Sequence, residues 1–311
     1  MALNSVINGV VPVAVLILFG LALGKRGVFD ESGTAAFSKL VVTIALPLDL
    51  FLAAVATPRS ELSNAKYLAA VAIVLIGLYG LTFAIGRTLL RNGAHESAIE
   101  ALAVGYPDLA FIGLPVYITA VGVTAGTLPV IVGNVVAAVV LLPVTVALLA
   151  SGAASGASRT TKIEQIAWNA VKPPLVWLPI LGVALGLLGV NHLPTVVTQT
   201  LDPVAKAAAG VGLLTIGLIL GQRRPAVDWN VATNTVLKLV VMPLAMLVVL
   251  GVLAIHGVDR RALLLLAVTP SATTAGILSI RYKAYVAEAS PTVFATTVVG
   301  FIGYIVVLSL T

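Results

Sequence analysis

The stretch from Glu96 to Val121 constrains the fold most, because it is an apolar span that is broken twice, at Gly105–Asp108 and at Gly113–Pro115. Each proline removes a backbone N–H and pushes against the carbonyl four residues earlier, so the helix must kink or unwind there. Pro107 lies about 16 Å into the span, near the centre of a hydrocarbon layer about 30 Å thick. Backbone groups freed at that depth need protein or water beside them, and such breaks are typical of the binding sites of secondary transporters.

The composition indicates a membrane protein. Of the 311 residues, 59% are hydrophobic and 10% are charged, and the mean hydropathy is +1.11. These values exclude a soluble globular protein and predict an all-α, polytopic membrane protein. The absence of cysteine excludes disulfides, thiol nucleophiles and thiolate metal sites. The net charge of +6 does not indicate a nucleic-acid partner, because the basic residues lie in short loops between apolar runs, where they set topology.

Ten apolar runs predict ten transmembrane helices, at 4–24, 35–56, 66–88, 96–121, 126–150, 174–190, 196–221, 232–255, 261–284 and 290–310. The first run lacks a basic start and is followed by Lys25 and Arg26, so we expect a retained helix rather than a signal peptide. We predict a first five-helix repeat at 1–150 and a second at 173–311. The polar interval 151–172 is predicted to be a cytoplasmic linker containing a short amphipathic helix.

The distribution of Lys and Arg between alternate loops predicts the topology. With the N-terminus outside, eleven basic residues fall in cytoplasmic loops: Lys25, Arg26, Arg87, Arg91, Arg159, Lys162, Lys172, Arg223, Arg224, Arg281 and Lys283. Four fall outside: Arg59, Lys66, Arg260 and Arg261. This excess favours both termini on the non-cytoplasmic side of the cell (inner) membrane.

The two halves resemble each other. Helices one and six share six residues at an offset of 162: Pro12, Leu16, Gly20, Ala22, Leu23 and Gly24 match Pro174, Leu178, Gly182, Ala184, Leu185 and Gly186. At an offset of 164, residues 93–104 resemble 257–268, and after a slip of one residue Pro107 matches Pro270. Five helices is an odd number, so the second copy must enter the membrane from the opposite side. We therefore predict two inverted repeats whose broken helices four and nine cross at the midplane.

The chain resembles the bacterial branch of the auxin efflux carrier family, within the superfamily of bile acid and sodium symporters. The resemblance rests on Pro12–Gly24 with its basic pair, Tyr106–Asp108 and Phe111–Pro115, Lys172–Pro174 with Leu193–Pro194, Lys238–Leu239 ahead of Pro243, and Pro270 followed by Ala272–Thr274. It implies ten helices, two inverted repeats, a transport site where helices four and nine cross, and small organic anions as substrates. The family usually has asparagine after the first crossover proline, where this chain has Asp108.

Asp108 is the main candidate site residue, because an acid at the bilayer centre is costly and usually functional. It could also cap the second half of helix four, and the two roles are compatible. If it binds and releases a proton, or takes Na⁺, it would couple an ion to transport. The matching turn in helix nine offers the hydroxyls of Ser271, Thr273 and Thr274 as substrate ligands, although such residues also cap broken helices.

Several further residues are candidates on weaker grounds. The turns themselves add Pro107, Phe111, Pro115 and Pro270 to the predicted substrate site. Lys206 could attract an anion or form an ion pair with Asp202, and the pairing is favoured slightly.

Asn134 is a further predicted substrate-site residue with an equally weighted structural alternative, and the other polar residues of the spans are expected to have structural roles. Asn134 could bind substrate or bond to a neighbouring helix. Lys238 is expected to snorkel, and Glu100 and Asp49 to be solvated or paired. The three histidines lack metal-site spacing, and the glycine pairs of helices one, six and seven are expected to let helices pack closely.

The sequence leaves two functions open and disfavours a third. A carrier for a small organic anion, working by alternating access with no cofactor beyond a coupling H⁺ or Na⁺, fits the paired breaks. A cation/proton exchanger that uses Asp108 fits the departure from asparagine. An enzyme is disfavoured because the chain contains neither an HExxH motif nor a P-loop. The expected partners are the bilayer and the substrate, and a homodimer is one option for the oligomeric state.

Overall fold

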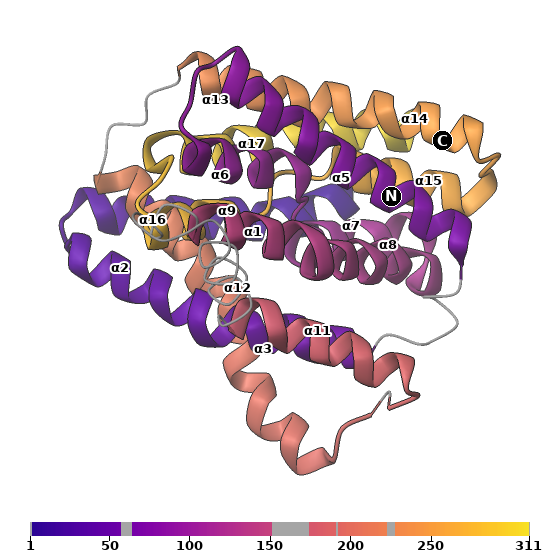
Figure 1. Ribbon diagram of the computed structural model, residues 1–311, viewed down its shortest axis with the longest axis horizontal. Helices are drawn as coiled ribbons and strands as arrows, with labels where there is room; N and C mark the ends of the chain where they lie inside the picture. Colours follow the sequence, from indigo (N-terminus) through magenta and orange to yellow (C-terminus); the bar gives the residue numbers. More distant parts are fainter. Residues whose placement is uncertain (1, 57–63, 151–173, 191, 223–227, 311) are drawn as a thin grey trace, which may run out of the picture.

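The computed structural model describes residues 2–56, 64–150, 174–190, 192–222 and 228–310 (Figure 1). Within these ranges the chain is helical, and its only extended pairing is one isolated β-bridge. The helices are α1 (Ala2–Lys25), α2 (Glu31–Leu40), α3 (Leu46–Val55), α5 (Ala65–Thr88), α6 (Ala94–Gly105), α7 (Leu114–Val121), α8 (Val123–Val136), α9 (Leu142–Ala150), α11 (Pro174–Leu187), α12 (Thr195–Gln222), α13 (Trp229–Val236), α14 (Met242–Val252), α15 (Gly257–Val268), α16 (Thr273–Tyr282) and α17 (Val286–Leu310). The predicted linker at 151–172 lies outside the described residues.

The described helices confirm an all-helical membrane protein. Six helical stretches are long and apolar enough to cross a membrane: Glu31–Val55, Ala65–Thr88, Ala125–Ala150, Thr195–Gln222, Trp229–Val252 and Val286–Leu310. Two shorter apolar helices are Val15–Lys25 and Pro174–Leu187. The two remaining predicted spans are the interrupted ones, α6 with α7 and α15 with α16. The count of ten crossings and the inverted relation of the halves stay predictions.

In the part of the chain that the structure describes, four π-helical turns interrupt the helices, and a proline follows each of them at the second position. The turns are Val41–Ala45, Leu109–Gly113, Ala137–Leu141 and Leu237–Val241, and the prolines are Pro47, Pro115, Pro143 and Pro243. A proline in a helix has no N–H to donate and crowds the carbonyl one turn back. The extra residue of a π turn is one of the recognised ways in which a helix accommodates such a break.

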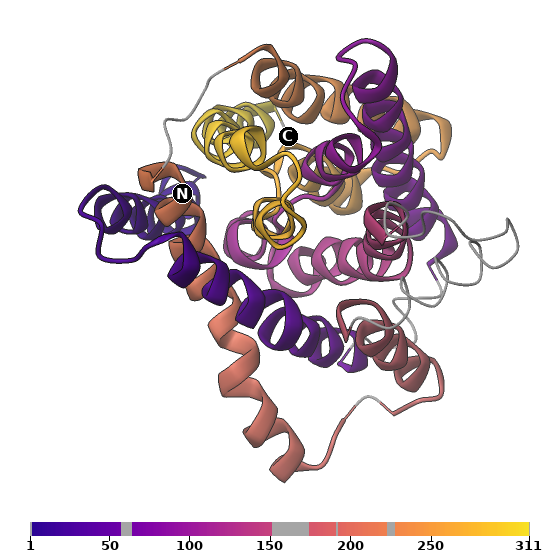
Figure 2. The ribbon, with the colours of Figure 1, turned by 60° about the vertical axis from the view of Figure 1, so that its left-hand side comes forward.

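The helices form two groups (Figure 2). In the first group, α1 packs along α12 and α11 packs along α3. Gly20 and Gly217 face each other so closely that a Cβ on Gly20 would lie 3.0 Å from the Gly217 Cα. A Cβ on Gly182 of α11 would likewise lie 2.7 Å from the Phe51 carbonyl oxygen of α3. The predicted role of these glycines in close helix packing is therefore confirmed.

The second group surrounds the two interrupted helices. Every residue is buried in Ser97–Gly105 of α6, in Ala262–Val268 of α15 and in Thr273–Ser279 of α16. A helix that is buried on all sides belongs to the centre of its bundle. Helices α5, α14 and α17 pack around this centre, and the fold thus places the two chain breaks in the interior of the protein.

Candidate functional site at the crossing of two interrupted helices

The two predicted breaks meet in space. Helix α6 ends at Gly105 and α15 ends at Val268, and the next residues, Tyr106 and Thr269, are extended. Pro107 and Ser271 then lie opposite each other in an antiparallel bridge. The Asp108 N–H donates to the Pro270 carbonyl (2.8 Å), and the Ala272 N–H donates to the Tyr106 carbonyl (2.9 Å). The two predicted breaks therefore lie side by side and are joined through their backbones, while their place as the fourth and ninth of ten crossings stays a prediction.

The bridge suits its sequence. In this antiparallel pairing the two facing residues exchange no hydrogen bonds, because the residues on either side of them carry both. Pro107 occupies one of these facing positions, where its missing N–H costs nothing. Opposite it, the Ser271 N–H points away from the bridge and donates to Thr296 Oγ1 at 3.2 Å.

The bridge also corrects the alignment of the two halves. Its local two-fold symmetry relates Pro107 to Ser271 and Asp108 to Ala272, which is a constant offset of 164. The predicted slip of one residue, which matched Pro107 with Pro270, is therefore wrong at the crossing. The prolines attracted the alignment, whereas the backbone pairing follows the offset of the preceding helices, residues 93–104 and 257–268.

A polar cluster anchors the end of α15 beneath the crossing. The Thr269 hydroxyl donates to the Leu265 carbonyl (2.8 Å) and accepts a bond from the Tyr304 hydroxyl of α17 (2.9 Å). The Tyr117 hydroxyl of α7 also bonds to Thr269. Three helices are thereby tied to the residue at which α15 unwinds, so the break is held in one geometry.

Asp108 links the two half-helices. Its side chain is buried, and its Oδ2 accepts from the N–H of Thr273, the first residue of α16, at 3.4 Å. Capping the second half of its own helix was one of two compatible roles predicted for Asp108, and the structure shows its carboxylate bonded to the start of the other interrupted helix. A carboxylate there is stabilised by the positive end of the helix dipole.

A small cavity lies against the crossing. Its volume is about 20 Å³, enough for a water molecule. The crossing and its flanks supply most of the lining: Tyr106, Pro107, Asp108, Leu109, Ala272, Thr273 and Thr274. Helix α3 adds Leu46, Asp49 and Leu50, and α8 adds Asn134. The sequence therefore located five of the lining residues: Pro107, Asp108, Asn134, Thr273 and Thr274.

Asn134 and the two threonines provide neutral polar groups at this cavity. The Tyr106 hydroxyl donates to Asn134 Oδ1 at 3.0 Å, which joins the α6 break to α8. Thr273 and Thr274 begin α16, whose first N–H groups have no partner within the helix. An arrangement of hydroxyls and an amide beside the first N–H groups of a helix can bind a carboxylate or a hydrated ion.

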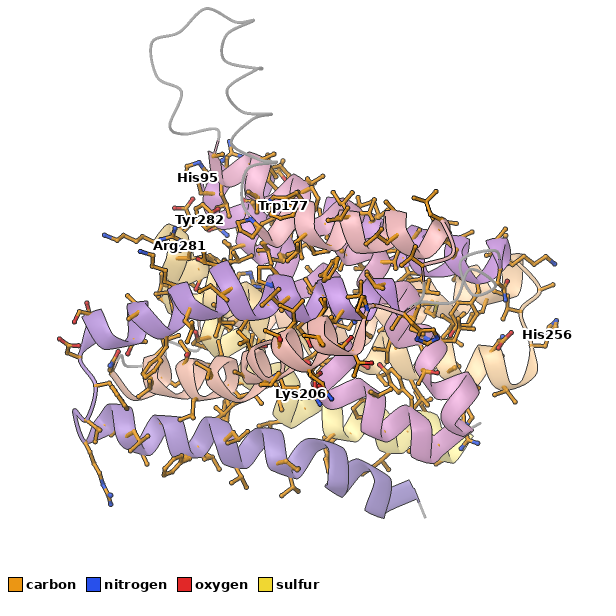
Figure 3. The ribbon with its side chains drawn as sticks, turned by 90° about the horizontal axis from the view of Figure 1, so that it is seen from below. His95, Trp177, Lys206, His256, Arg281 and Tyr282 are labelled. Carbon is orange, nitrogen blue, oxygen red and sulfur yellow. The ribbon has the colours of Figure 1, made fainter. Side chains whose placement is uncertain are left out.

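Other predicted site residues do not line the cavity. Pro270 and Ser271 belong to the bridge but are not among the lining residues. Lys206 Nζ pairs with Asp202 Oδ2 at 2.5 Å, and its side chain is 74% exposed on α12 (Figure 3). The i, i+4 ion pair between Asp202 and Lys206, which the sequence slightly favoured, is therefore confirmed. Phe111 and Pro115 follow the break, and their side chains lie outside the described part of the protein.

Two charged residues are more deeply involved than the sequence indicated. Lys238 was expected to snorkel, but its side chain is 0% exposed, and its ammonium contacts Met242 Sδ at 3.0 Å. Asp108 is the acidic group whose charge acts on it. Asp49 lines the cavity, close enough to Asp202 for their charges to repel. The sequence did not indicate either environment, because the burial of Lys238 and Asp49 depends on the helices that pack against them.

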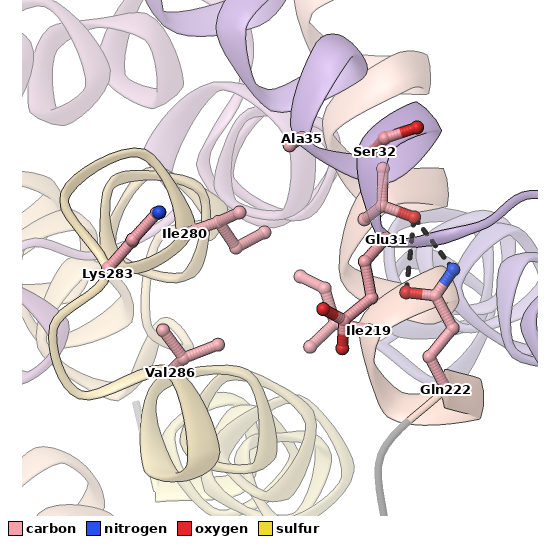
Figure 4. A pocket seen from close by; sticks show the side chains of 9 residues that line it. Glu31, Ser32, Ala35, Ile219, Gln222, Ile280, Lys283 and Val286 are labelled. Atoms are coloured by element: carbon pink, nitrogen blue, oxygen red, sulfur yellow. Dashed lines mark hydrogen bonds between the residues drawn. The ribbon is translucent and has the colours of Figure 1, made fainter.

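A larger pocket of about 500 Å³ opens between α2, α12, α16 and the start of α17 (Figure 4). Glu31 and Gln222 lie on one side of it and Lys283 on the other. The Ser38 hydroxyl of α2 donates to the Ile277 carbonyl of α16 at 2.9 Å, which ties the two helices together deeper in the protein. The pocket is lined by Ile280, near the C-terminal end of α16, whereas the N-terminal end of the same helix lies at the crossing.

The described residues do not suggest a metal centre. No group of three or more His, Asp or Glu side chains among them is placed to hold a metal ion. His95 and His256 lie at opposite ends of the protein (Figure 3).

Comparisons with known proteins agree with this architecture. A family model described as "Membrane transport protein" matches residues 5–308. The chain is 28% identical over 302 residues to "Uncharacterized transporter YfdV" of Escherichia coli strain K12, covering 96% of this chain and 95% of the relative. It is 26% identical over 292 residues to a Rhizobium meliloti protein named "Putative malonate transporter", covering 93% and 90%. The match spans nearly the whole chain and confirms the resemblance seen in the sequence: this protein belongs to the auxin efflux carrier-type family of membrane transport proteins and is a transporter rather than an enzyme.

Proposed function

We propose that the protein is a secondary carrier for a small organic anion, which binds at the crossing of α6/α7 and α15/α16 and is moved by alternating access. The observation that carries this proposal is the paired interruption, in which the Asp108 and Ala272 N–H groups hold the two breaks together beside a cavity. In many secondary transporters, the backbone N–H and C=O groups at the ends of half-helices form the binding site.

The charges around the crossing are compatible with an anion. Helix α16 directs its positive end toward the cavity, where Thr273 and Thr274 add hydroxyls. The buried Lys238 lies within reach of the electrostatic field of Asp108. A relative named as a malonate transporter makes a small dicarboxylate the first substrate to test.

Inverted repeats would supply the two related conformations that alternating access needs. Two observations support them. The bridge relates the two breaks by a local two-fold axis. In addition, α1, the first helix of one proposed repeat, packs on α12, the second helix of the other. In the same way, α11 packs on α3. The proposal keeps the predicted location in the inner membrane, with both termini outside.

Proteoliposomes loaded with unlabelled malonate test the proposal by exchange against external labelled malonate and other small organic acids. The wild-type protein should exchange at least one of these anions, and Asp108→Ala combined with Thr273→Ala should abolish that exchange. Asp259→Ala combined with Thr200→Ala, which changes the same residue types away from the crossing, should leave it unchanged. Unaffected exchange in the Asp108/Thr273 variant would rule out this site.

A cation/proton exchanger is the second candidate, because Asp49 and Asp108 both line the cavity and none of its described lining residues is basic. In that case Asp108 would release a proton to bind Na⁺. Vesicles with a trapped fluorescent pH probe distinguish the two functions: Na⁺ addition should change the internal pH only for an exchanger, and Asp108→Asn should abolish that change.

A further inference from the structure

Glu100 lies in α6, seven residues before Pro107, and so about 10 Å from the break along the helix. We expected it to be solvated or paired, but its side chain is 0% exposed. The Asn92 side-chain amide donates to Oε2 at 2.9 Å, while Oε1 is buried without a partner. A buried carboxylate with one oxygen unsatisfied carries a large cost in free energy, which a bound proton or cation would remove.

The carboxyl group is tightly enclosed. Its Oε2 packs against Gly86 of α5, so closely that a Cβ on that glycine would overlap it. The same Cβ would lie 2.8 Å from Ser97 Oγ, a second buried oxygen without a partner. A proton occupies no additional volume, whereas a metal cation would have to push these groups apart. The packing therefore favours a proton over Na⁺ as the species bound here.

Neutral hydrogen-bonding groups face Glu100 from other elements. The Tyr285 hydroxyl lies beside the carboxyl group and accepts from the Asn234 amide of α13 at 2.9 Å. Because that hydroxyl already accepts a bond, its own proton is free to point at Glu100. The Asn234 Oδ1 is a third buried acceptor without a partner.

The backbone at Tyr285 is held in an unusual conformation to make this contact. Tyr285 has φ 55° and Lys283 has φ 54°, both in the left-handed region that favours glycine. A bulky residue there is strained, and such strain is concentrated at functional sites. Here it turns the Tyr285 side chain inward, where it is buried beside Glu100.

The ionisable groups around Glu100 do not neutralise it. Asp228, which caps α13, and Glu288 of α17 are both acidic and act on its charge. From α5, the Arg87 guanidinium bonds to the Asn92 carbonyl (2.8 Å). The α6 helix itself also carries Glu96, and the elements packed against it carry Arg281 and Tyr282, at the end of α16, and Lys238, whose ammonium contacts Met242.

We infer that the Glu100 carboxyl group is a second site of the carrier, distinct from the crossing, that binds and releases one proton in each transport cycle. The inference rests on the proposed carrier function. Its proton would be exchanged with water on the side of Asn92, which is partly exposed and bonds directly to Glu100. Since Glu100 and the crossing share α6, protonation at one is positioned to be linked to substrate binding at the other.

Glu100→Gln tests the inference, because it preserves shape and removes the proton. In proteoliposomes with an imposed pH gradient, wild-type protein should accumulate labelled malonate, and Glu100→Gln should only equilibrate it, to an inside-to-outside ratio of about one. Exchange without a gradient should persist in the variant. Glu96→Gln, one turn earlier on the same helix and partly exposed, is the matched control and should accumulate malonate like the wild type.

Infrared difference spectra between acidic and alkaline pH provide a readout that does not depend on transport. The wild-type protein should show the carbonyl band of a protonated carboxylic acid, and Glu100→Gln should lack it. Tyr285→Phe, which keeps the carboxyl group, should shift the pH at which the band is half lost. This variant keeps the inference testable if Glu100→Gln fails to fold.

The outcomes separate the two proposals. If the wild type moves no organic acid but the infrared band is lost in Glu100→Gln, the proposed anion transport fails while proton binding at Glu100 stands. Gradient-driven accumulation that survives in Glu100→Gln would overturn the inference and leave the carrier function intact. Accumulation that requires Na⁺ and ignores the pH gradient would also overturn it.

Discussion

Pro107 and Ser271 lie opposite each other in an antiparallel bridge, although 163 residues separate them in the chain. The two hydrogen bonds of this bridge are made by the flanking residues, from Asp108 to Pro270 and from Ala272 to Tyr106. The bridge therefore joins two helices at the points where each has lost its own backbone bonding. Buried backbone groups that would otherwise lack partners are satisfied, and the cavity beside them acquires a fixed outline.

Ala272→Pro should weaken the crossing selectively. Ala272 has φ −65°, which proline adopts without strain, so the substitution mainly removes the N–H that bonds to the Tyr106 carbonyl. Leaving that buried carbonyl unpaired should cost about 1–3 kcal/mol of unfolding free energy and reduce malonate exchange. Ala65→Pro, at the first position of α5 where proline is tolerated, is the control. Thermal unfolding in detergent checks both variants, and equal midpoints would contradict the role of the bridge.

Asp108 and Lys238 should be energetically coupled. Each single change, Asp108→Asn or Lys238→Met, removes one of two buried groups whose charges act on each other, and should change the free energy of unfolding more than the same change in an exposed pair. The double variant should lose less stability than the sum of the two single variants. The exposed pair Asp202 and Lys206 is the comparison, since the same changes there should each cost less than about 1 kcal/mol. Strict additivity for Asp108 and Lys238 would show that the two charges do not interact.

Gly217→Ala should separate α1 from α12. A Cβ at this position would overlap the Ile17 carbonyl and lie 2.7 Å from the Leu21 nitrogen, and these backbone atoms cannot turn aside. Overpacking of this kind costs about 1–3 kcal/mol. Gly210→Ala, on the same helix, meets open space and should be neutral or stabilising by up to about 1 kcal/mol. Comparable unfolding midpoints for the two variants would refute the close approach of these helices.

The sequence predicted the breaks well and the electrostatics poorly, for physical reasons. Proline and glycine change the backbone itself, so Pro107 and Pro270 marked the crossing without any knowledge of neighbouring helices. The environment of a charged side chain depends on what packs against it. Lys238 and Glu100 were expected near solvent because of their positions along a helix, yet α6 and its neighbours bury both completely. The contribution of α3 to the cavity, through Asp49, also required the tertiary structure.

Protection of a single cysteine by substrate tests the central claim most directly. The chain has no cysteine, so Thr274→Cys places its only thiol at the cavity, and Leu89→Cys places one on an exposed loop as the control. In membranes that exchange labelled malonate or another accepted acid, that acid should slow alkylation of the thiol at position 274 in a saturable way and leave position 89 unaffected. The contradicting result would be a protein that still exchanges the acid while the thiol at position 274 is alkylated equally fast with and without it. The substrate would then bind elsewhere.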